Sequence, residues 1–243
     1  MIINDILSIG KEQFGFVSLK GELEAEGLSH IEISREAIIA AKNGLDYLIK
    51  IGGCEAKSNL QYLIDIGITS VVAPMIESPF AMEKYMEMLP TEAFDHIGVT
   101  IETITAVENI EHIIKAGSKL TEITIGRTDL TASYHGNDVE SKKTIDMVKR
   151  VARLGKENNL LVTMGGSISK RTVDTLLQDL ELSELIDFIE TRKVVINAKK
   201  FVLPGSLENS LKFELAILEE RLGVNEKFVE NAKKRQLAIS KRL

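Results

Sequence analysis

Two acidic residues follow neighbouring apolar runs in the middle of the chain. Glu102 comes directly after the run at residues 97–101, and Asp129 comes shortly after the run at residues 123–125. Consecutive strands of a parallel sheet usually lie side by side, with their carboxyl ends facing the same way. We therefore expect Glu102 and Asp129 to meet at one edge of a sheet.

A carboxylate pair without a thiol or an imidazole in the motif suits a hard divalent cation that keeps positions open for water and substrate. Mg²⁺ or Mn²⁺ is the natural candidate for Glu102 and Asp129. The alternative is that each carboxylate only accepts hydrogen bonds from backbone N–H groups in its own turn. The position of both residues at adjacent strand ends, with Gly126 leading into the second, favours the metal site.

The segment between the two acidic residues has the pattern of a helix. Thr105 and Glu108 have the spacing of a capping box, an apolar stripe follows, and Gly117 is placed to end the helix. The whole stretch is therefore predicted to be a strand, a crossover helix and a second strand.

The same alternation recurs along the chain and indicates a parallel sheet with helices outside it. The predicted strands are residues 16–19, 47–51, 71–75, 97–101, 123–125, 160–164 and 186–189. Seven repeats favour a TIM (β/α)8 barrel that forms a single domain over residues 1–243. The eighth strand is either residues 194–196, which lie close to the seventh strand, or part of residues 1–14. A doubly wound open sheet is the alternative, but no G-x-G-x-x-G motif follows the first strand.

Extra helices are predicted after the barrel, at about residues 206–240. Leucines at 207, 211, 215, 218 and 222 form a helical stripe that Gly223 should end, and a last helix should begin near Asn225.

The composition of the chain limits the kinds of partner that it could bind and the cell compartment in which it is expected. The net charge of −6 argues against general attraction to nucleic acid. No apolar run approaches the roughly 20 residues that span a bilayer, and the first residues lack the features of a signal peptide. The single cysteine, Cys54, excludes an intrachain disulfide and fits a reducing cytoplasm.

With these residues in view, the chain resembles the HpcH/HpaI aldolase and citrate lyase β-subunit family over about residues 16–196. The most specific stretches are IETITAVENI around Glu102 and IGRTDLTAS around Asp129, supported by LIKIGG and VVAPMIES. The resemblance implies a modified TIM barrel in which Glu102 and Asp129 hold a divalent metal. It also implies carbon–carbon bond chemistry on pyruvate or oxaloacetate through an enolate, and a homo-oligomer that exchanges a C-terminal helix. The leucine stripe could be that helix, and packing on the chain's own barrel would explain it equally well.

The chain departs from the family pattern at two positions. Lys50 stands where the family usually has an arginine, and a lysine can stabilise an enolate as a point charge but cannot form a planar clamp. Lys50 could alternatively form an ion pair with Glu22 at the barrel rim. The aldolase branch also has a histidine base that is missing from residues 20–23, where Glu22 is our candidate for acid–base or water-orienting duty.

Backbone N–H groups of Gly126, Arg127 and Thr128 are candidates for binding the substrate carboxylate, although an ordinary turn would explain the same residues. The sequence thus predicts a metal-dependent aldolase that takes a 2-oxo acid and an aldehyde. A lyase for CoA esters of the citrate or malyl type is one alternative. A non-catalytic barrel that binds a small acid is the other.

Overall fold

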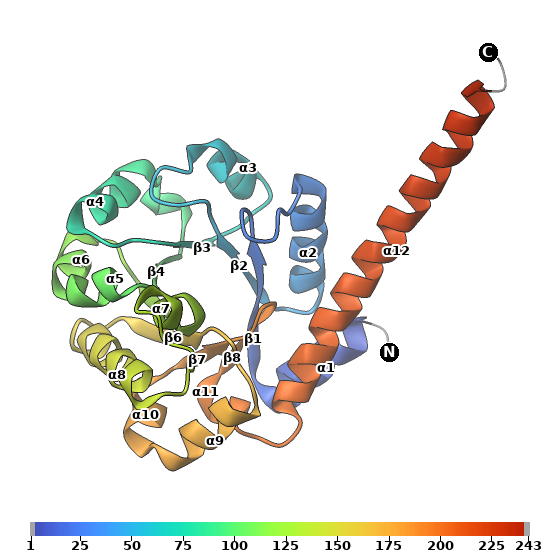
Figure 1. Cartoon of the computed structure of the whole chain (residues 1–243). Coiled ribbons are helices and arrows are strands. Elements are labelled where there is room, and N and C mark those ends of the chain that lie inside the picture. The colour runs from blue at the N-terminus through green and yellow to red at the C-terminus, as the bar shows by residue number, and fades with distance from the viewer. Residues whose placement is uncertain (1–2, 241–243) are drawn as a thin grey trace.

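Eight strands close into a barrel in the part of the chain that the computed structural model describes, residues 3–240 (Figure 1). Neighbours in the sequence are also neighbours in the barrel, as short crossovers require. The strands are β1 (Phe16–Glu22), β2 (Asp46–Lys50), β3 (Ser70–Ala73), β4 (His96–Ile101), β5 (Glu122–Gly126), β6 (Leu161–Gly165), β7 (Phe188–Glu190) and β8 (Val194–Asn197). The predicted barrel and all seven predicted strands are confirmed.

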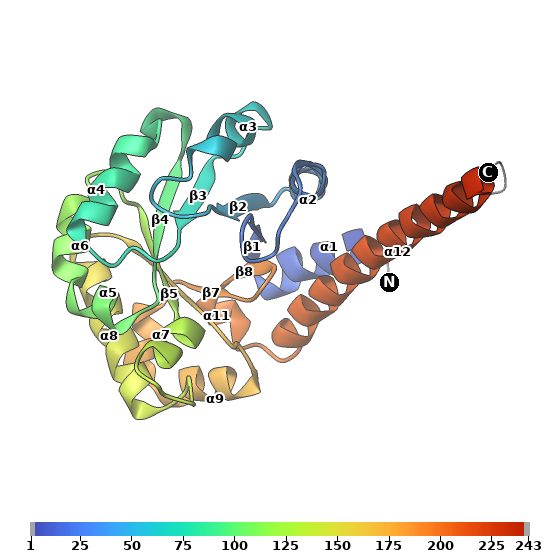
Figure 2. The same cartoon turned by 45° about the horizontal axis from the view of Figure 1, so that its top comes forward.

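Helices surround the barrel and connect its strands (Figure 1, Figure 2). They are α1 (Ile3–Phe14), α2 (His30–Lys42), α3 (Leu60–Asp65), α4 (Pro79–Met88), α5 (Ile104–Glu108), α6 (Ile110–Ala116), α7 (Arg127–Ser133), α8 (Lys142–Glu157), α9 (Lys170–Gln178), α10 (Leu180–Leu185), α11 (Ala198–Phe201) and α12 (Ser206–Ser240). Two 3₁₀ turns, Lys57–Asn59 and Thr91–Ala93, complete the connections. None of the helices described for residues 3–240 combines the length and apolar character needed to cross a membrane.

The last two strands form a hairpin that interrupts the parallel pattern. β8 pairs antiparallel with β7 on one side and with β1 on the other. Only three residues separate β7 from β8, which is too short for a parallel crossover, and the N–H of Thr191 donates to the carbonyl of Val194 at 2.9 Å. Of the two positions expected for the eighth strand, the one at residues 194–196 is therefore correct. The alternative in residues 1–14 is wrong, because Ile3–Phe14 is helix α1.

Side chains that alternate along each strand divide the interior into two regions. One set, including Ile49, Val71 and Ile123, packs between the barrel and its helices. The other set points into the barrel, where Leu48, Val72 and Val195 form a small apolar cluster. The inward positions nearer the carboxyl ends are polar, so the apolar cluster is the floor beneath a polar cavity.

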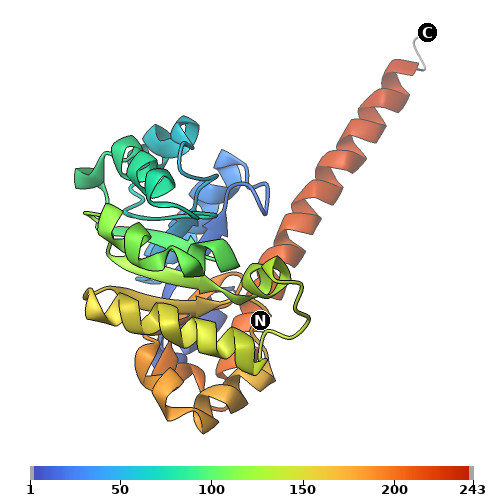
Figure 3. The same ribbon diagram turned by 60° about the vertical axis from the view of Figure 1, so that its left-hand side comes forward.

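One long helix, α12, replaces the two helices expected after the barrel. It runs through Gly223 without a break and extends away from the barrel (Figure 3). Its first turns are anchored: Phe213 and Ile217 are buried, and Asn209 donates to the carbonyl of Ile6 on α1 at 3.0 Å. The remaining leucines of the stripe are exposed, at 42% for Leu211, 59% for Leu215, 39% for Leu218 and 62% for Leu222. Packing on the chain's own barrel therefore does not explain the stripe at Leu215, Leu218 and Leu222.

Candidate active site

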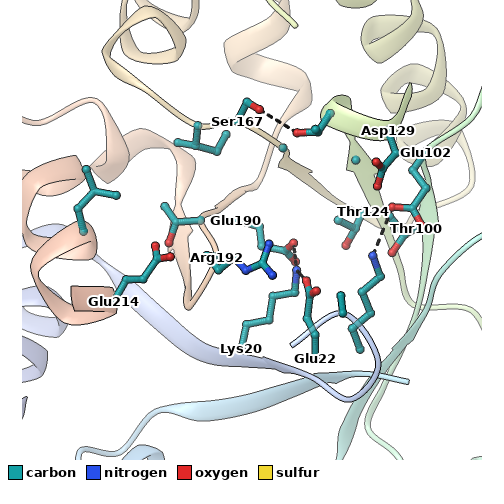
Figure 4. A pocket seen from close by; sticks show the side chains of 18 residues that line it. Lys20, Glu22, Thr100, Glu102, Thr124, Asp129, Ser167, Glu190, Arg192 and Glu214 are labelled. Atoms are coloured by element: carbon teal, nitrogen blue, oxygen red, sulfur yellow. Dashed lines mark hydrogen bonds and ion pairs between the residues drawn. The ribbon is translucent and has the colours of Figure 1, made fainter. Parts of the chain in front are cut away.

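A cavity of about 410 Å³ opens at the carboxyl ends of the parallel strands (Figure 4). It is lined by strand ends, by the loops that follow them and by the first turns of α12. The charged lining residues are Lys20, Glu22, Lys50, Glu102, Asp129, Glu190, Arg192 and Glu214, and the polar ones include Thr100, Thr124, Thr128 and Ser167. Active sites of TIM-barrel enzymes lie at this end of the barrel.

Glu102 and Asp129 both line this cavity and lie close together, as the sequence predicted (Figure 4). Glu102 follows β4 directly and is 2% exposed. Its Oε1 accepts a hydrogen bond from the Met75 N–H at 3.0 Å, and its Oε2 lies 3.3 Å from Nζ of Lys50. Burial raises the pKa of Glu102, and the nearby Asp129 carboxylate acts in the same direction.

The loops after β4 and β5 fix the position of the carboxylate pair. Thr103, not Thr105, is the N-cap of the helix after β4, since its hydroxyl accepts from the Ala106 N–H at 3.2 Å and the helix begins at Ile104. The predicted N-cap, Thr105, was therefore wrong by two residues. Ser133, at the end of α7, accepts from the Ile104 N–H at 2.9 Å. This bond ties the helix that carries Asp129 to the start of the helix that follows Glu102.

Gly126 provides the space into which Glu102 leans. A Cβ atom added at Gly126 would lie 2.9 Å from Cβ of Glu102 and 3.0 Å from its Oε2. Any larger residue would push the Glu102 carboxylate out of its present position. The glycine is thus needed for the geometry of the carboxylate pair, whether or not its own N–H binds substrate.

The sequence analysis proposed backbone N–H groups of three residues as donors to a substrate carboxylate, and the side chains of these residues lie in different places. Gly126 and Thr128 line the cavity, whereas the Arg127 side chain is fully buried elsewhere. Its guanidinium donates to Glu140 Oε1 at 2.8 Å and to the carbonyls of Gly165 and Gly166 at 3.2 and 3.0 Å. Arg127 therefore holds the turn after β6 against the start of α7.

That turn leaves room beside two backbone nitrogens. Gly166 has a φ of +86°, and an added Cβ would lie 2.5 Å from the nitrogen of Thr128 and 2.7 Å from that of Arg127. The absence of a side chain at Gly166 keeps both nitrogens uncovered on this side. The Thr128 and Ser167 hydroxyls, 2.9 Å apart, flank the same space.

A second charged group lies across the cavity from Glu102 and Asp129 (Figure 4). Nζ of Lys20 forms ion pairs with Glu22, at 2.6 Å, and with Glu190. Burial acts to lower the pKa of Lys20, but the two carboxylates outweigh it and hold that pKa above its usual value. Burial likewise acts to raise the pKa of Glu22, but Lys20 outweighs it and the pKa is lowered. Lys20 and Glu22 are therefore both charged at neutral pH.

Sequence reasoning missed Lys20 and Glu190 as parts of the site. Glu190 ends β7 just as Glu102 follows β4, so its position at a strand end was the available signal. Lys50, expected to be a possible partner of Glu22, pairs with Glu102 instead.

The lining of the cavity suits a divalent cation. Among the described lining residues, the five carboxylates outnumber the three cationic side chains by two. No cluster of three or more His, Cys, Asp or Glu side chains with metal-ligating geometry occurs in the described residues. Two carboxylates with water and substrate completing the shell is the mode in which Mg²⁺ usually binds at enzyme sites. Glu102 and Asp129 have the chemistry for that mode.

Comparisons with known proteins found a matching family model and similar solved structures. The model of the HpcH/HpaI aldolase/citrate lyase family matches residues 36–198, about two-thirds of the chain. An HpcH/HpaI aldolase from Desulfitobacterium hafniense superposes with a TM-score of 0.63, at 15% identity over 90% of each chain. The citrate synthase SbnG superposes with a TM-score of 0.61, at 13% identity over 90% of each chain.

Two further similarities cover less of this chain. A citrate lyase β subunit from M. tuberculosis, complexed with oxaloacetate and magnesium, has a TM-score of 0.53 at 15% identity over 78% of this chain and 85% of its own. Two probable GTP 3',8-cyclases from Methanococcus maripaludis are 25% identical over 134 residues, which are 51% of this chain and 44% of the cyclases. The chain thus spans less than half the length of these curated relatives. The structural similarities establish the barrel fold.

Proposed function

The chain belongs to the HpcH/HpaI aldolase/citrate lyase family, and we propose that it is a divalent-metal-dependent carbon–carbon lyase. Its substrate is a 2-oxo acid, and the bond breaks or forms through a pyruvate-like enolate with an aldehyde as the second partner. The observation that carries the proposal is the convergence of Glu102 and Asp129 in a cavity whose lining has an excess of two negative charges.

Glu102 and Asp129 would hold Mg²⁺ or Mn²⁺, which acts there as a Lewis acid toward the substrate oxygens. The citrate lyase β subunit of M. tuberculosis, which contains magnesium and oxaloacetate, supports both the ion and the substrate class. The 3.3 Å ion pair between Lys50 and Glu102 places the lysine charge beside the two carboxylates. We assign Lys50 to stabilising the negative charge that develops on the enolate oxygen.

The substrate carboxylate is assigned to the space between α7 and the turn after β6. The backbone nitrogens of Arg127 and Thr128 border that space, and the absence of a side chain at Gly166 keeps it open. The buried Arg127 side chain acts indirectly, because it holds the turn after β6 in place through hydrogen bonds to the carbonyls of Gly165 and Gly166. Its role in substrate binding is therefore carried by its N–H group, not by its charge.

Glu22 is assigned to orienting a water molecule or the neighbouring ammonium group. It lies 2.6 Å from Lys20, and its lowered pKa makes it a weaker base than an ordinary glutamate. A weak base accepts hydrogen bonds well but takes a proton poorly near neutral pH. Orientation therefore fits Glu22 better than proton transfer does.

Deuterium exchange into the methyl group of pyruvate tests the proposal, because exchange requires enolisation. We expect the wild-type protein to catalyse exchange with Mg²⁺ or Mn²⁺ and to lose it after chelation. Asp129→Asn should abolish the metal-dependent exchange, whereas the control Asp146→Asn, which alters an exposed ion pair on α8, should not. Undiminished exchange in Asp129→Asn would remove the basis of the metal assignment. Absence of exchange in the wild type across metals and 2-oxo acids would favour a non-catalytic acid-binding barrel.

A CoA-ester lyase of the citrate or malyl type is the second candidate. It is favoured by the stretch VVAPMIES, whose Met75 N–H donates to Glu102 and so lies at the cavity. The similarity to a citrate lyase β subunit points the same way. Turnover that depends on acetyl-CoA, in place of plain aldol cleavage, would identify this activity.

We also propose that the protein is a homo-oligomer in which α12 contacts a second copy. The exposed leucines at 211, 215, 218 and 222 lie on a helix that extends away from its own barrel. Burial of such a surface against a second subunit would be favourable.

A further inference from the structure

Glu102 and Glu190 lie on opposite sides of the paired strands β5 and β6. Glu102 follows β4, the neighbour of β5, and Glu190 ends β7, the neighbour of β6. Strand register pairs Gly126 with Gly165, and Gly165 with Glu190. Glu102 leans over Gly126, and an added Cβ at Gly165 would lie 3.3 Å from Oε1 of Glu190. Each carboxylate thus sits beside a glycine of the adjacent strand, and the two glycines leave the space between the carboxylates open.

The two oxygens of Glu190 have different surroundings. Oε1 is bonded to Nζ of Lys20. Oε2 is buried and makes no hydrogen bond with any residue in the range 3–240, although the residue lines the cavity and is 93% buried. Thr100, two residues before Glu102 on β4, has a buried hydroxyl that also lacks a partner among the described residues. Buried polar atoms are normally hydrogen-bonded, so these oxygens indicate that a polar ligand group belongs beside them.

Glu22, the other carboxylate bound to Lys20, is less suited to proton transfer. Lys20, Lys50 and Arg192 all stabilise its charged form. Glu190 forms an ion pair with Lys20, which also pairs with Glu22, and it interacts electrostatically with Glu122 deeper in the barrel. Glu190 therefore keeps one oxygen free, while Lys20 fixes the orientation of the other.

We propose that Glu190 is a catalytic residue whose Oε2 accepts the proton of the 4-hydroxyl group when a 4-hydroxy-2-oxo acid is cleaved. This inference rests on the proposed function. It supplies the base that the family pattern would place as a histidine near residues 20–23.

The proton and electrons balance within one turnover. The O–H electron pair of the 4-hydroxyl becomes the second bond of the aldehyde carbonyl, and its proton moves to Oε2 of Glu190. The bond between C3 and C4 breaks, and its electron pair remains on the 2-oxo acid fragment as an enolate. That proton is then returned to C3, which gives pyruvate and regenerates the Glu190 carboxylate. Condensation follows the same steps in reverse.

Comparison of two reactions isolates the role of Glu190. Decarboxylation of oxaloacetate forms the same enolate, but it has no hydroxyl proton to remove. Aldol cleavage needs both the enolate and the base. The substrate for cleavage is whichever member of a panel of 4-hydroxy-2-oxo acids the wild type cleaves fastest with Mg²⁺ or Mn²⁺.

Glu190→Gln should reduce the kcat of aldol cleavage by about 10²- to 10⁴-fold, the usual contribution of a general base. It should leave oxaloacetate decarboxylation within about twofold of the wild type. Gly165→Ala, which crowds the Glu190 carboxylate, should lower cleavage selectively but less. The control Glu181→Gln removes an exposed carboxylate that pairs with Arg153 and should change neither reaction.

The outcomes separate this inference from the proposed function. Absence of both metal-dependent reactions in the wild type would reject the proposed function itself. Wild-type decarboxylation without cleavage of any panel member would overturn the role of Glu190. Equal loss of cleavage and decarboxylation in Glu190→Gln and Gly165→Ala would also overturn the role of Glu190. Unchanged cleavage in Glu190→Gln would overturn it as well.

Discussion

Lys50 and Glu102 form an ion pair across the mouth of the barrel, with Nζ 3.3 Å from Oε2. Lys50 ends β2 and Glu102 follows β4, so the lysine reaches over β3, where its register partner is the short side chain of Val72. The pair is largely buried, with Lys50 at 17% and Glu102 at 3% side-chain exposure. A fixed positive charge therefore lies beside the carboxylate pair that we assign to the metal.

Replacing Lys50 by methionine tests whether this charge serves catalysis. Lys50→Met keeps an unbranched side chain out to Cε but removes the ammonium group. Loss of one fixed electrostatic group typically lowers kcat by about 10²- to 10³-fold, and we expect that loss in pyruvate deuterium exchange. Lys84→Met, which removes an exposed partner of Glu87 on α4, is the control. A normal exchange rate in Lys50→Met would reduce Lys50 to a structural ion-pair partner.

Gly126→Ala should weaken metal binding without unfolding the barrel. The backbone at Gly126, with φ of −87°, is accessible to alanine. The new methyl group would nevertheless lie 2.9 Å from Cβ of Glu102. Displacement of groups that orient a metal ligand commonly lowers metal affinity by about 10- to 100-fold, which calorimetric titration with Mn²⁺ would measure. Unchanged affinity together with a normal circular dichroism spectrum would mean that Glu102 does not bind the ion.

The buried pair of Arg127 and Glu140 predicts a specific dependence of stability on pH. Burial acts to raise the pKa of Glu140, but Arg127 and the hydroxyls of Thr172 and Thr175 outweigh it and lower that pKa. A carboxylate whose pKa is lower in the folded protein than in the unfolded chain stabilises the fold. This stabilisation is fully present at pH values above the pKa of the group in the unfolded chain. That stabilisation is lost as pH falls through the folded pKa, here below the ordinary value of 4.5.

Glu140→Gln should therefore be less stable than the wild type at pH 7, by about 3 kcal/mol for a broken buried pair. The difference in unfolding free energy between the two proteins should shrink as pH falls below about 4.5. Urea unfolding at a series of pH values measures both curves. Parallel curves across that range would show that the pair does not titrate in the way proposed.

The exposed leucines of α12 predict a change in oligomeric state on substitution. The double variant Leu215→Ser and Leu222→Ser removes two side chains that are 59% and 62% exposed in the single chain. We expect its mass by light scattering to fall to that of a smaller assembly or a monomer. Leu180→Ser, at a leucine that is 75% exposed on α10, should leave the mass unchanged. A wild-type protein that is monomeric at micromolar concentration would contradict the proposed contact.

Local patterns were sufficient to predict most of the barrel. The apolar run at residues 97–101 became the buried strand β4, and its boundary with Glu102 was visible in the sequence. Because all seven parallel strands end on one face, the meeting of Glu102 and Asp129 followed from topology alone. The resemblance to a known family then supplied the expected chemistry.

Features that depend on distant contacts were not predicted. The ion pair between Lys20 and Glu190 joins residues 170 positions apart, and no local spacing encodes it. The helix α12 continues through Gly223, although the local signal predicts an end there. The partners of the Arg127 side chain also depend on tertiary packing: the sequence analysis proposed a role only for its backbone N–H group, and the structure shows its guanidinium bound to Glu140 and to the turn after β6.

A crystal soaked with Mn²⁺ and oxalate, a planar mimic of the enolate, tests the metal site directly. We expect one anomalous scattering peak within coordination distance of an oxygen from Glu102 and an oxygen from Asp129, with oxalate on the open side of the ion. We also expect Lys50 to lie beside the bound oxalate. No peak between the two carboxylates at saturating Mn²⁺, or side chains turned away from a peak elsewhere, would show that Glu102 and Asp129 do not hold the metal.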